Sequence, residues 1–406
     1  MPALLKALKR ATGEVPAPAD EDAFLDAEEA VLHCDAHPDG GFGFTNRQLL
    51  ASQRNAVMEV IKEAGKSLLT GHLDLISLSL PVKMFESRSY LEKLTDVWVF
   101  PCFLDRAAAA SSPLYRLQLV ATWFIAGQQN AFASWMKPFN PILGETFQAA
   151  TASGTRVYLE QISHHPPIAA YQMMGPGRAW VLTGVSRPEV RYKGNAVKTL
   201  VRGARTITFA DGTRMELNFP SYLLKGILYS DQPHGEMDGT FSILDVTHNL
   251  RCQIEFGKVV GERNWLLQRP DSFSGQIVQL NAPAVGACQT LHRGSSFTHL
   301  ASKFASLAAP SSKAADAREP AEEVLSRCVG NWLAFCDWDG SRFWTLVSEP
   351  PECWLPDSQP LPSDARYRSD LQQLKQGNLQ AAQAAKELLE AQQRTDARWR
   401  RRTTTG

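Results

Sequence analysis

The sequence has no excess of charge of either sign and no long apolar run. Its 42 Lys and Arg residues balance its 42 Asp and Glu residues, so no overall field favours nucleic acid or an anionic membrane, and any charged recognition must be local. No stretch approaches the roughly 18 consecutive apolar residues that a membrane-spanning helix needs. The opening residues, MPALLKALKR, also lack the apolar core of a secretory signal. We therefore expect a soluble chain that touches membranes only at their surface.

Paired cysteines and common catalytic signatures are missing too. The seven cysteines are odd in number, scattered and never spaced as Cys-x-x-Cys, which argues against a zinc module or a secreted disulfide framework. A reducing, cytosolic setting fits this use of cysteine best. The sequence has no His-Glu-x-x-His metal motif and no Gly-x-Ser-x-Gly nucleophile elbow near its paired histidines. We expect no metal and no other cofactor.

What is present begins with residues 1–45, which we interpret as a tail. Its first ten residues could form a short amphipathic helix, and a frayed terminus is preferred over a membrane-surface helix because the segment is short. Further on, the acidic stretch PADEDAFLDAEEA is either a solvated run of charge or a docking motif. It resembles an FFAT motif, which binds VAP-type receptors on the endoplasmic reticulum, although Ala23 and Leu25 depart from the usual pattern. The FFAT-like residues are Phe24, Asp26, Ala27 and Glu29.

The periodicity of the remaining chain changes from helix to strand and back. Apolar residues recur at threes and fours after Asn46, a residue type that caps helices, and 81–150 is interpreted as a mainly helical segment. Strand patterns fill 151–347, with tight turns expected at Asp211-Gly212, Asp238-Gly239 and Asp339-Gly340. Residues 306–323 are small and charged, typical of a disordered insertion or surface loop. Residues 348–406 have the composition of helices.

The strand region is long enough for a dozen or more strands. A meander of that size usually curls or closes, because an open sheet leaves unpaired edges. A barrel with so many strands is too wide for its own side chains to fill. We therefore expect an α+β fold whose sheet encloses a cavity.

The stretch LEQISHHPPIAAY places His164 and His165 directly before two prolines. Adjacent residues on a strand point to opposite faces, so a shared metal ion is not expected. An acid/base pair, a purely structural role and a clamp for an anion all stay open. The clamp is attractive because Pro166 and Pro167 remove backbone donors, leaving the imidazoles as the available donors.

Three ordered motifs resemble one family. EQISHHPP is similar to the EQVSHHPP fingerprint of the oxysterol-binding-protein-related lipid-transfer proteins, with Ile162 as the one departure. KPFNPILGETF precedes it, and the closing segment from LPSDARYRSD to EAQQR follows it. The resemblance spans about residues 46–394. The chain resembles a short form of the family, because the tail leaves no room for a pleckstrin-homology domain.

The resemblance implies a fold and a cargo. The fold is a large incomplete antiparallel β-barrel around a lipid tunnel, with 46–80 as a helical lid and helices before and after the barrel. The implied cargoes are phosphatidylinositol 4-phosphate and a sterol or phosphatidylserine, exchanged between membranes without catalysis. The residues implied for the inositol-lipid head group are Lys137, His164, His165, Lys386, Glu390 and Arg394. The lid residues are Leu73, Ile76 and Leu78.

Two points rest on the residues themselves. Lys386, Glu390 and Arg394 fall four apart, about 6 Å per step, so they form one stripe on a helix, which alone could be a surface salt-bridge ladder. Asn140 and Glu145 are interpreted as structural. We expect a cytoplasmic protein that is peripheral to membranes and that the FFAT-like stretch would place at contacts with the endoplasmic reticulum. The alternatives are a lipid sensor or scaffold with little transfer, and a hydrolase acting on a lipid ester through the histidines.

Overall fold

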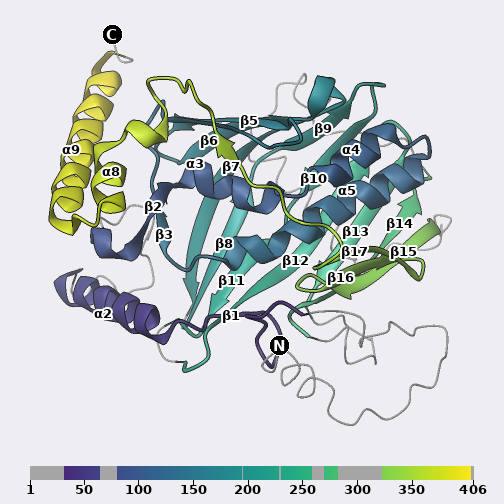
Figure 1. Cartoon of the computed structure of the whole chain (residues 1–406), viewed down its shortest axis with the longest axis horizontal. Helices are drawn as coiled ribbons and strands as arrows, with labels where there is room; N and C mark the ends of the chain where they lie inside the picture. The colour runs from purple at the N-terminus through teal and green to yellow at the C-terminus, as the bar shows by residue number, and fades with distance from the viewer. Residues whose placement is uncertain are drawn as a thin grey trace, which may run out of the picture.

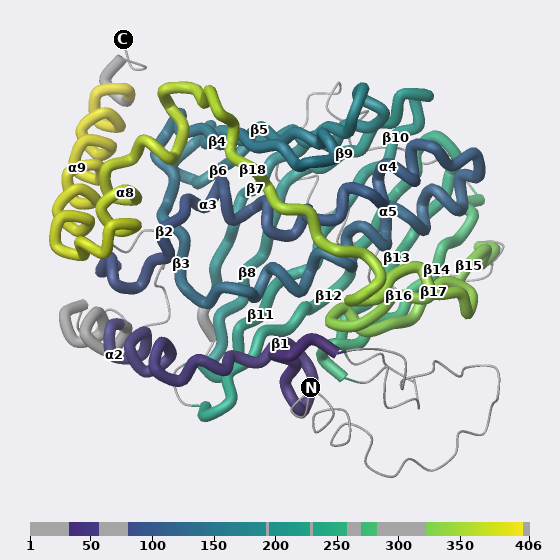
Figure 2. The backbone as a smooth tube through the Cα atoms, viewed as in Figure 1, coloured from purple at the N-terminus to yellow at the C-terminus, as the bar shows by residue number. Residues whose placement is uncertain are grey.

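The computed structural model describes residues 32–64, 80–193, 195–227, 230–257, 269–281 and 322–403. The FFAT-like residues, the lid residues Leu73, Ile76 and Leu78, and 306–321 of the expected insertion lie outside this described part. Figures 1 and 2 show a large curved sheet with helices against one face and at one end. No helix in the described ranges combines the length and the apolar character needed to cross a bilayer.

The described strands form one sheet of 16 strands and one small pair. Every neighbouring pair in the large sheet is antiparallel. Its strands are β1 (Phe42–Gly43), β4 (Thr146–Ala150), β5 (Arg156–Ser163), β6 (Ile168–Met174), β7 (Trp180–Lys193), β8 (Ala196–Arg202), β9 (Arg205–Phe209), β10 (Arg214–Asn218), β11 (Ser221–Lys225), β12 (His234–Asp245), β13 (Leu250–Phe256), β14 (Ser272–Gln279), β15 (Glu323–Asn331), β16 (Phe335–Trp338), β17 (Ser341–Thr345) and β18 (Leu355–Pro356). The parallel pair is β2 (Phe85–Ser89) with β3 (Lys137–Phe139). The expected number of strands is confirmed.

The sheet closes only in part, and two long strands make the closure. β7 pairs with β9 along its first half and with β8 along its second, while β12 pairs with β11 along its first half and with β10 along its second. Because β9 pairs with β10 and β8 with β11, these six strands form a closed circuit. The path ends at β17 on one side and β18 on the other. This confirms the expected incomplete antiparallel barrel with helices before and after it.

The expected turn at Asp238-Gly239 is wrong. Both residues lie inside β12, where Asp238 pairs with β11 and Gly239 pairs with β13. Gly239 has φ +96°, a conformation that glycine adopts without steric cost, so it bends the strand as it passes from one set of partners to the other. The other two Asp-Gly pairs do form turns, and Asp339-Gly340 has φ +50° and +77°, as in a type I′ hairpin.

The helix α5 (Pro113–Gly127) lies across the sheet beside α4 (Cys102–Ala109) (Figure 1). Ser112 caps it by accepting from the Tyr115 amide, and Pro113 occupies its first turn. Every residue from Arg116 to Gly127 is buried, as the nearly all-round apolar sequence predicts. Phe124 stacks on Phe241 of the sheet with ring centroids 3.9 Å apart.

A second, smaller core joins the remaining helices at one end of the sheet. It packs α2 (Arg47–Ala64), η3 (Val82–Met84), α8 (Ser369–Lys375) and α9 (Leu379–Thr403) around the β2–β3 pair. Asn46 caps α2 as expected, since its side chain accepts from the Leu49 amide at 2.9 Å. The buried residues of this second core are Ala56, Val82, Met84, Phe85, Phe139, Ala365, Leu371 and Ala382. This core places the end of β3 beside the C-terminal helices (Figure 2).

Short helices complete the chain. They are α3 (Tyr90–Lys93), η4 (Leu94–Trp98), η5 (Gln128–Phe132), η6 (Pro176–Arg178) and η8 (Ala365–Tyr367). Strands β2, β3 and β4 also fall within the segment expected to be mainly helical, and β15 starts at the last residue of the expected insertion, Glu323.

Candidate head-group site

Lys137 is the first of the expected site residues and begins β3. Its ammonium lies 4.8 Å from the ring centroid of Phe85, the residue opposite it on β2. The Nζ also donates to Asn140 Oδ1 at 2.5 Å. Burial, followed by the positive charges of Lys386 and Arg368, lowers the pKa of Lys137 to about 8, and Glu390 opposes this shift. The ring face of Phe85 and the amide oxygen of Asn140 therefore stabilise the charged form of Lys137. Burial and the neighbouring positive charges disfavour that form.

Lys386, Glu390 and Arg394 share one face of α9, as their spacing predicts. Lys386 is buried, with 5% of its surface exposed, and its Nζ lies 2.6 Å from Glu390 Oε1. Arg394 Nη1 lies 3.9 Å from the other oxygen of Glu390 and its side chain is 61% exposed. The Lys386 ammonium is 5.6 Å from the centroid of Phe85. The stripe is therefore more than a surface ladder, because its first member reaches the ring that carries Lys137.

His164 and His165 lie in the turn between β5 and β6, immediately after Ser163 ends the strand. Their ring centroids are 4.5 Å apart at 67°. The expectation that the two side chains diverge is wrong, because it assumed that the strand continues through them. Ser163 fixes this turn by donating from Oγ to Pro166 O at 2.7 Å.

His164 in this turn interacts electrostatically with charged residues of the C-terminal helix α9. Burial, followed by the positive charges of His165 and Arg400, lowers the pKa of His164. The backbone carbonyl of Pro141 and the carboxylate of Glu390 oppose that shift. Glu390 thus acts on Lys137, His164, Lys386 and Arg394 alike. In the described ranges, the side chains whose geometry suits a metal ion are His33, Cys34 and Asp35, and the histidine pair is not among them.

Sequence reasoning interpreted Asn140 and Glu145 as structural but missed Arg368 and Phe85, which help to position the cations. Arg368 has 8% of its surface exposed and donates to Glu145 at 2.7 Å, to Asp370 at 3.0 and 2.7 Å, and to the carbonyl of Asn140 at 2.9 Å. Glu145 also accepts from Ser89 and from the Ile142 amide. This network ties the loop after Lys137 to α8. Phe85 carried no signal beyond its apolar character.

Strands β8 and β11 leave one face of the sheet partly uncovered. Residues of β8 and β11 are half-buried almost without alternation, unlike β5 or β13. Tyr222 and Leu224 pack on the main core, and the register sets Thr199 and Val197 opposite them, so these four share the inner face. The opposite face is charged, with ion pairs joining Lys198 to Asp238, Lys225 to Glu236 and Arg202 to Glu189.

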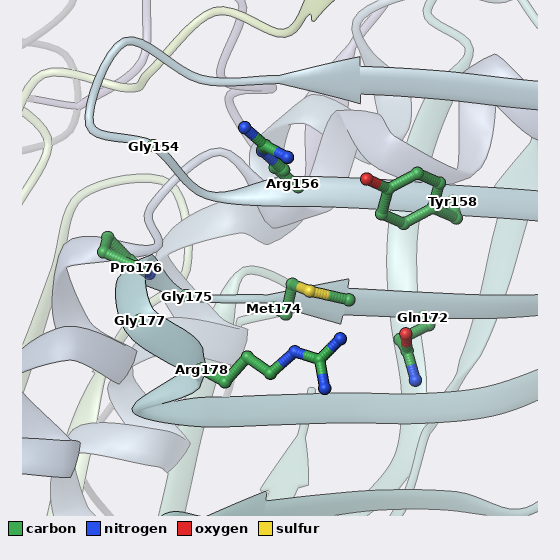
Figure 3. Close-up of a pocket in the computed structure, with 9 residues that line it drawn as sticks. All are labelled: Gly154, Arg156, Tyr158, Gln172, Met174, Gly175, Pro176, Gly177 and Arg178. Carbon is green, nitrogen blue, oxygen red and sulfur yellow. The ribbon is translucent and has the colours of Figure 1, made fainter.

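A separate groove of about 600 Å³ opens on the outer side of β5 and β6. Figure 3 shows Arg156 and Arg178 along its borders, with Met174 between them and Tyr158 beside Arg156 on β5. None of the expected head-group residues lines it, so it is distinct from the candidate site.

Comparison with known proteins gives a consistent result. A family model described as oxysterol-binding protein matches residues 68–331. "Oxysterol-binding protein 9" of Dictyostelium discoideum is 30% identical over 367 residues, covering 88% of this chain and 78% of that protein. Human "Oxysterol-binding protein-related protein 5" is 33% identical over 212 residues, and the match covers 49% of this chain but only 24% of that much longer protein.

Two solved structures share the fold. The Osh3 ORD of Saccharomyces cerevisiae in complex with PI(4)P superposes with a TM-score of 0.61 at 19% identity, covering 84% of each chain. The Osh1 ORD domain in complex with cholesterol gives the same TM-score and identity, covering 87% of this chain and 89% of that one.

Proposed function

Because the chain belongs to the oxysterol-binding protein family, we propose that it carries one lipid inside its barrel and holds an inositol-lipid head group at the end occupied by α9. The membership confirms the resemblance seen in the sequence and the expectation of a non-enzymatic lipid-binding protein. The proposed head-group residues are Lys137, His164, His165, Lys386, Glu390 and Arg394.

One observation carries this proposal: two lysines from distant parts of the chain meet over the ring of Phe85. Two ammonium groups that contact the same ring repel each other, and burial adds to the free-energy cost of keeping both protonated. A phosphorylated sugar would relieve the repulsion, with Lys137 and Lys386 as point charges and Arg394 as a fork for phosphate oxygens. Glu390 would then accept hydrogen bonds from inositol hydroxyls.

The half-covered inner face of β8 and β11 supports the lipid part of the proposal. An inner face that protein contacts cover only in part suits a hydrocarbon chain, and each buried methylene contributes about 0.8 kcal/mol. Solved relatives of this fold hold PI(4)P in one case and cholesterol in another. We propose that phosphatidylinositol 4-phosphate exchanges here with a sterol or with phosphatidylserine. The lid expected at residues 46–80, with Leu73, Ile76 and Leu78, would cover the bound lipid.

A sensor or scaffold is the second candidate. Its motivation is the FFAT-like stretch around Phe24, which would dock the chain on a VAP-type receptor and place it in the cytoplasm at contacts with the endoplasmic reticulum. Phe24→Ala should abolish capture by the receptor in a pull-down, and unchanged capture would refute the motif. Saturable lipid binding with negligible transfer between donor and acceptor liposomes would favour the sensor.

Mass spectrometry of the lipids that co-purify with the protein tests the proposed function directly. We expect an inositol phospholipid and a second lipid class, together at no more than one molecule per chain because they share one cavity. Purification without any bound lipid, from cells that contain both classes, would count against a carrier. Recovery of intact lipid after long incubation would reject a hydrolase.

A further inference from the structure

Arg205 is a buried cation inside the barrel. It begins β9 with 2% of its surface exposed. Its guanidinium donates to the carbonyls of Gly203 at 3.0 Å and Val201 at 2.8 Å, and lies 4.2 Å from the ring centroid of Phe219. Among the described residues no carboxylate forms an ion pair with it, in contrast to the buried Arg368. A buried charge is costly unless it is paired.

Tyr171 lies beside Arg205 because of a glycine between them. The register runs directly from Tyr171 on β6 to Gly184 on β7 and on to Arg205 on β9. A Cβ on Gly184 would stand 2.6 Å from the Tyr171 hydroxyl, so the phenol lies across the space that a side chain would fill. That hydroxyl is buried and lies within reach of the Arg205 guanidinium. Burial raises the pKa of Tyr171, and the charge of Arg205 opposes the rise.

The neighbours of this pair are neutral hydroxyl and amide groups. The Tyr90 hydroxyl lies 3.0 Å from Ser186 Oγ, and the Tyr222 hydroxyl donates to Gln128 at 2.8 Å. Burial raises the pKa of Tyr90 to about 12, with the charge of Arg205 opposing, yet Tyr90 and Tyr222 both keep accessible surface. Their remaining accessible surface indicates that protein atoms do not fill all the space beside them. That space adjoins the half-covered face of β11.

We propose that Arg205 and Tyr171 form an inner polar site that receives the carboxylate of a lipid whose hydrocarbon lies in the barrel. This rests on the proposed function, since it assumes that the barrel takes a lipid. Arginine offers five N–H donors, and the carbonyls of Gly203, Val201 and Arg202 take three of them, the last at 3.5 Å. Two N–H groups remain, one of which can reach the Tyr171 hydroxyl, and that hydroxyl keeps its own proton to donate, so the site offers donors to a carboxylate oxygen.

Dodecanoate and dodecanol, which differ in the end group, test the proposal by calorimetric titration of the delipidated full chain. Dodecanoate should bind at least about tenfold more tightly than dodecanol, because a charge-assisted pair replaces a neutral one. Arg205→Gln should remove this preference while leaving dodecanol affinity within about twofold. Arg187→Gln is the matched control, since Arg187 lies on β7 with its side chain 48% exposed, and it should keep the preference.

A second variant guards against failure to fold. Tyr171→Phe keeps the ring and removes the hydroxyl, and it should lower the preference for dodecanoate about threefold or more. Equal wild-type affinity for the two probes would overturn the inner site but leave the lipid carrier intact. Equal loss of both probes in Arg205→Gln, with a lower melting temperature, would make Arg205 a purely structural residue. Failure of both probes to bind the wild type would overturn the inner site and the lipid cavity together.

Discussion

The ammonium groups of Lys137 and Lys386 lie over one aromatic ring, 4.8 and 5.6 Å from the centroid of Phe85. The ring face attracts both cations and offsets part of their mutual repulsion. It also fixes where they stand before any ligand arrives, so less ordering is lost on binding. This geometry is the one that the proposed head-group site requires.

Phe85→Leu should weaken extraction of phosphatidylinositol 4-phosphate from liposomes by about three- to tenfold, through loss of the ring under both lysines. The substitution also removes buried volume, which costs about 1–2 kcal/mol of stability. Phe139→Leu is the matched control, since its ring packs against Phe85 at 4.7 Å in the same core but not against the lysines. Equal loss of extraction in both variants would assign Phe85 to packing alone.

Affinity for the inositol lipid should fall as the pH rises above 8. Lys137 has a pKa of about 8 in the free protein, and a bound phosphate favours its charged form. Binding above pH 8 then requires proton uptake, and affinity drops by up to about tenfold per pH unit. The phosphate itself is fully ionised in this range. Lys137→Arg stays charged, so its affinity should be level between pH 8 and about 10.

The stability of the ligand-free protein should change in the opposite direction. The pKa of Lys137 lies below its ordinary value of 10.5, so between the two values the unfolded chain binds more protons than the folded one. Stability contributed by this group therefore rises with pH across that window. Denaturant titrations of wild type and Lys137→Met would show the difference in slope, and parallel pH profiles would contradict the lowered pKa.

Glu390→Gln should destabilise the ligand-free protein and enlarge the stabilisation caused by ligand. The buried Lys386 ammonium loses a carboxylate 2.6 Å away, at a cost of about 1–3 kcal/mol. A bound phosphate would restore a negative charge to the stripe, so the melting-temperature shift with soluble inositol phosphate should exceed that of the wild type. Glu387→Gln, on the same helix and bonded to Gln383, should change neither quantity. A smaller shift in Glu390→Gln would contradict this role.

Arg368→Lys should cost about 3 kcal/mol or more, because lysine cannot fork onto two buried carboxylates. Arg368 joins Glu145 and Asp370 and supports the Asn140 loop that holds Lys137. Extraction of the inositol lipid should fall even in the folded fraction. Arg366 is the matched control, because it pairs with Asp364 and its side chain is 29% exposed. Arg366→Lys should therefore be tolerated. Chemical denaturation separates the two.

Motifs with local causes were predictable from the sequence. The cap at Asn46, the fully buried α5, the spacing of Lys386, Glu390 and Arg394, and the turns at Asp211-Gly212 and Asp339-Gly340 follow from neighbours within a few residues. The antiparallel barrel followed from the number of strands together with the cost of open edges.

Features set by long-range pairing were not predictable. Gly239 bends β12 because the strand changes partners there, and a lone Asp-Gly pair cannot report that. Phe85 and Arg368 act through residues far away in the chain. In the sequence, Phe85 is an ordinary apolar residue and Arg368 an ordinary charged residue. The row from Tyr171 through Gly184 to Arg205 exists only once the register of three strands is known.

Extraction of phosphatidylinositol 4-phosphate from liposomes by a His164→Ala, His165→Ala double variant tests the central claim most directly. The claim is that the β5–β6 turn and the lysines over Phe85 grip one phosphorylated head group. We predict that the double variant keeps the wild-type melting temperature within a few degrees and loses extraction by at least about a hundredfold, since two charge-assisted donors disappear. Wild-type extraction by a folded double variant would contradict the account.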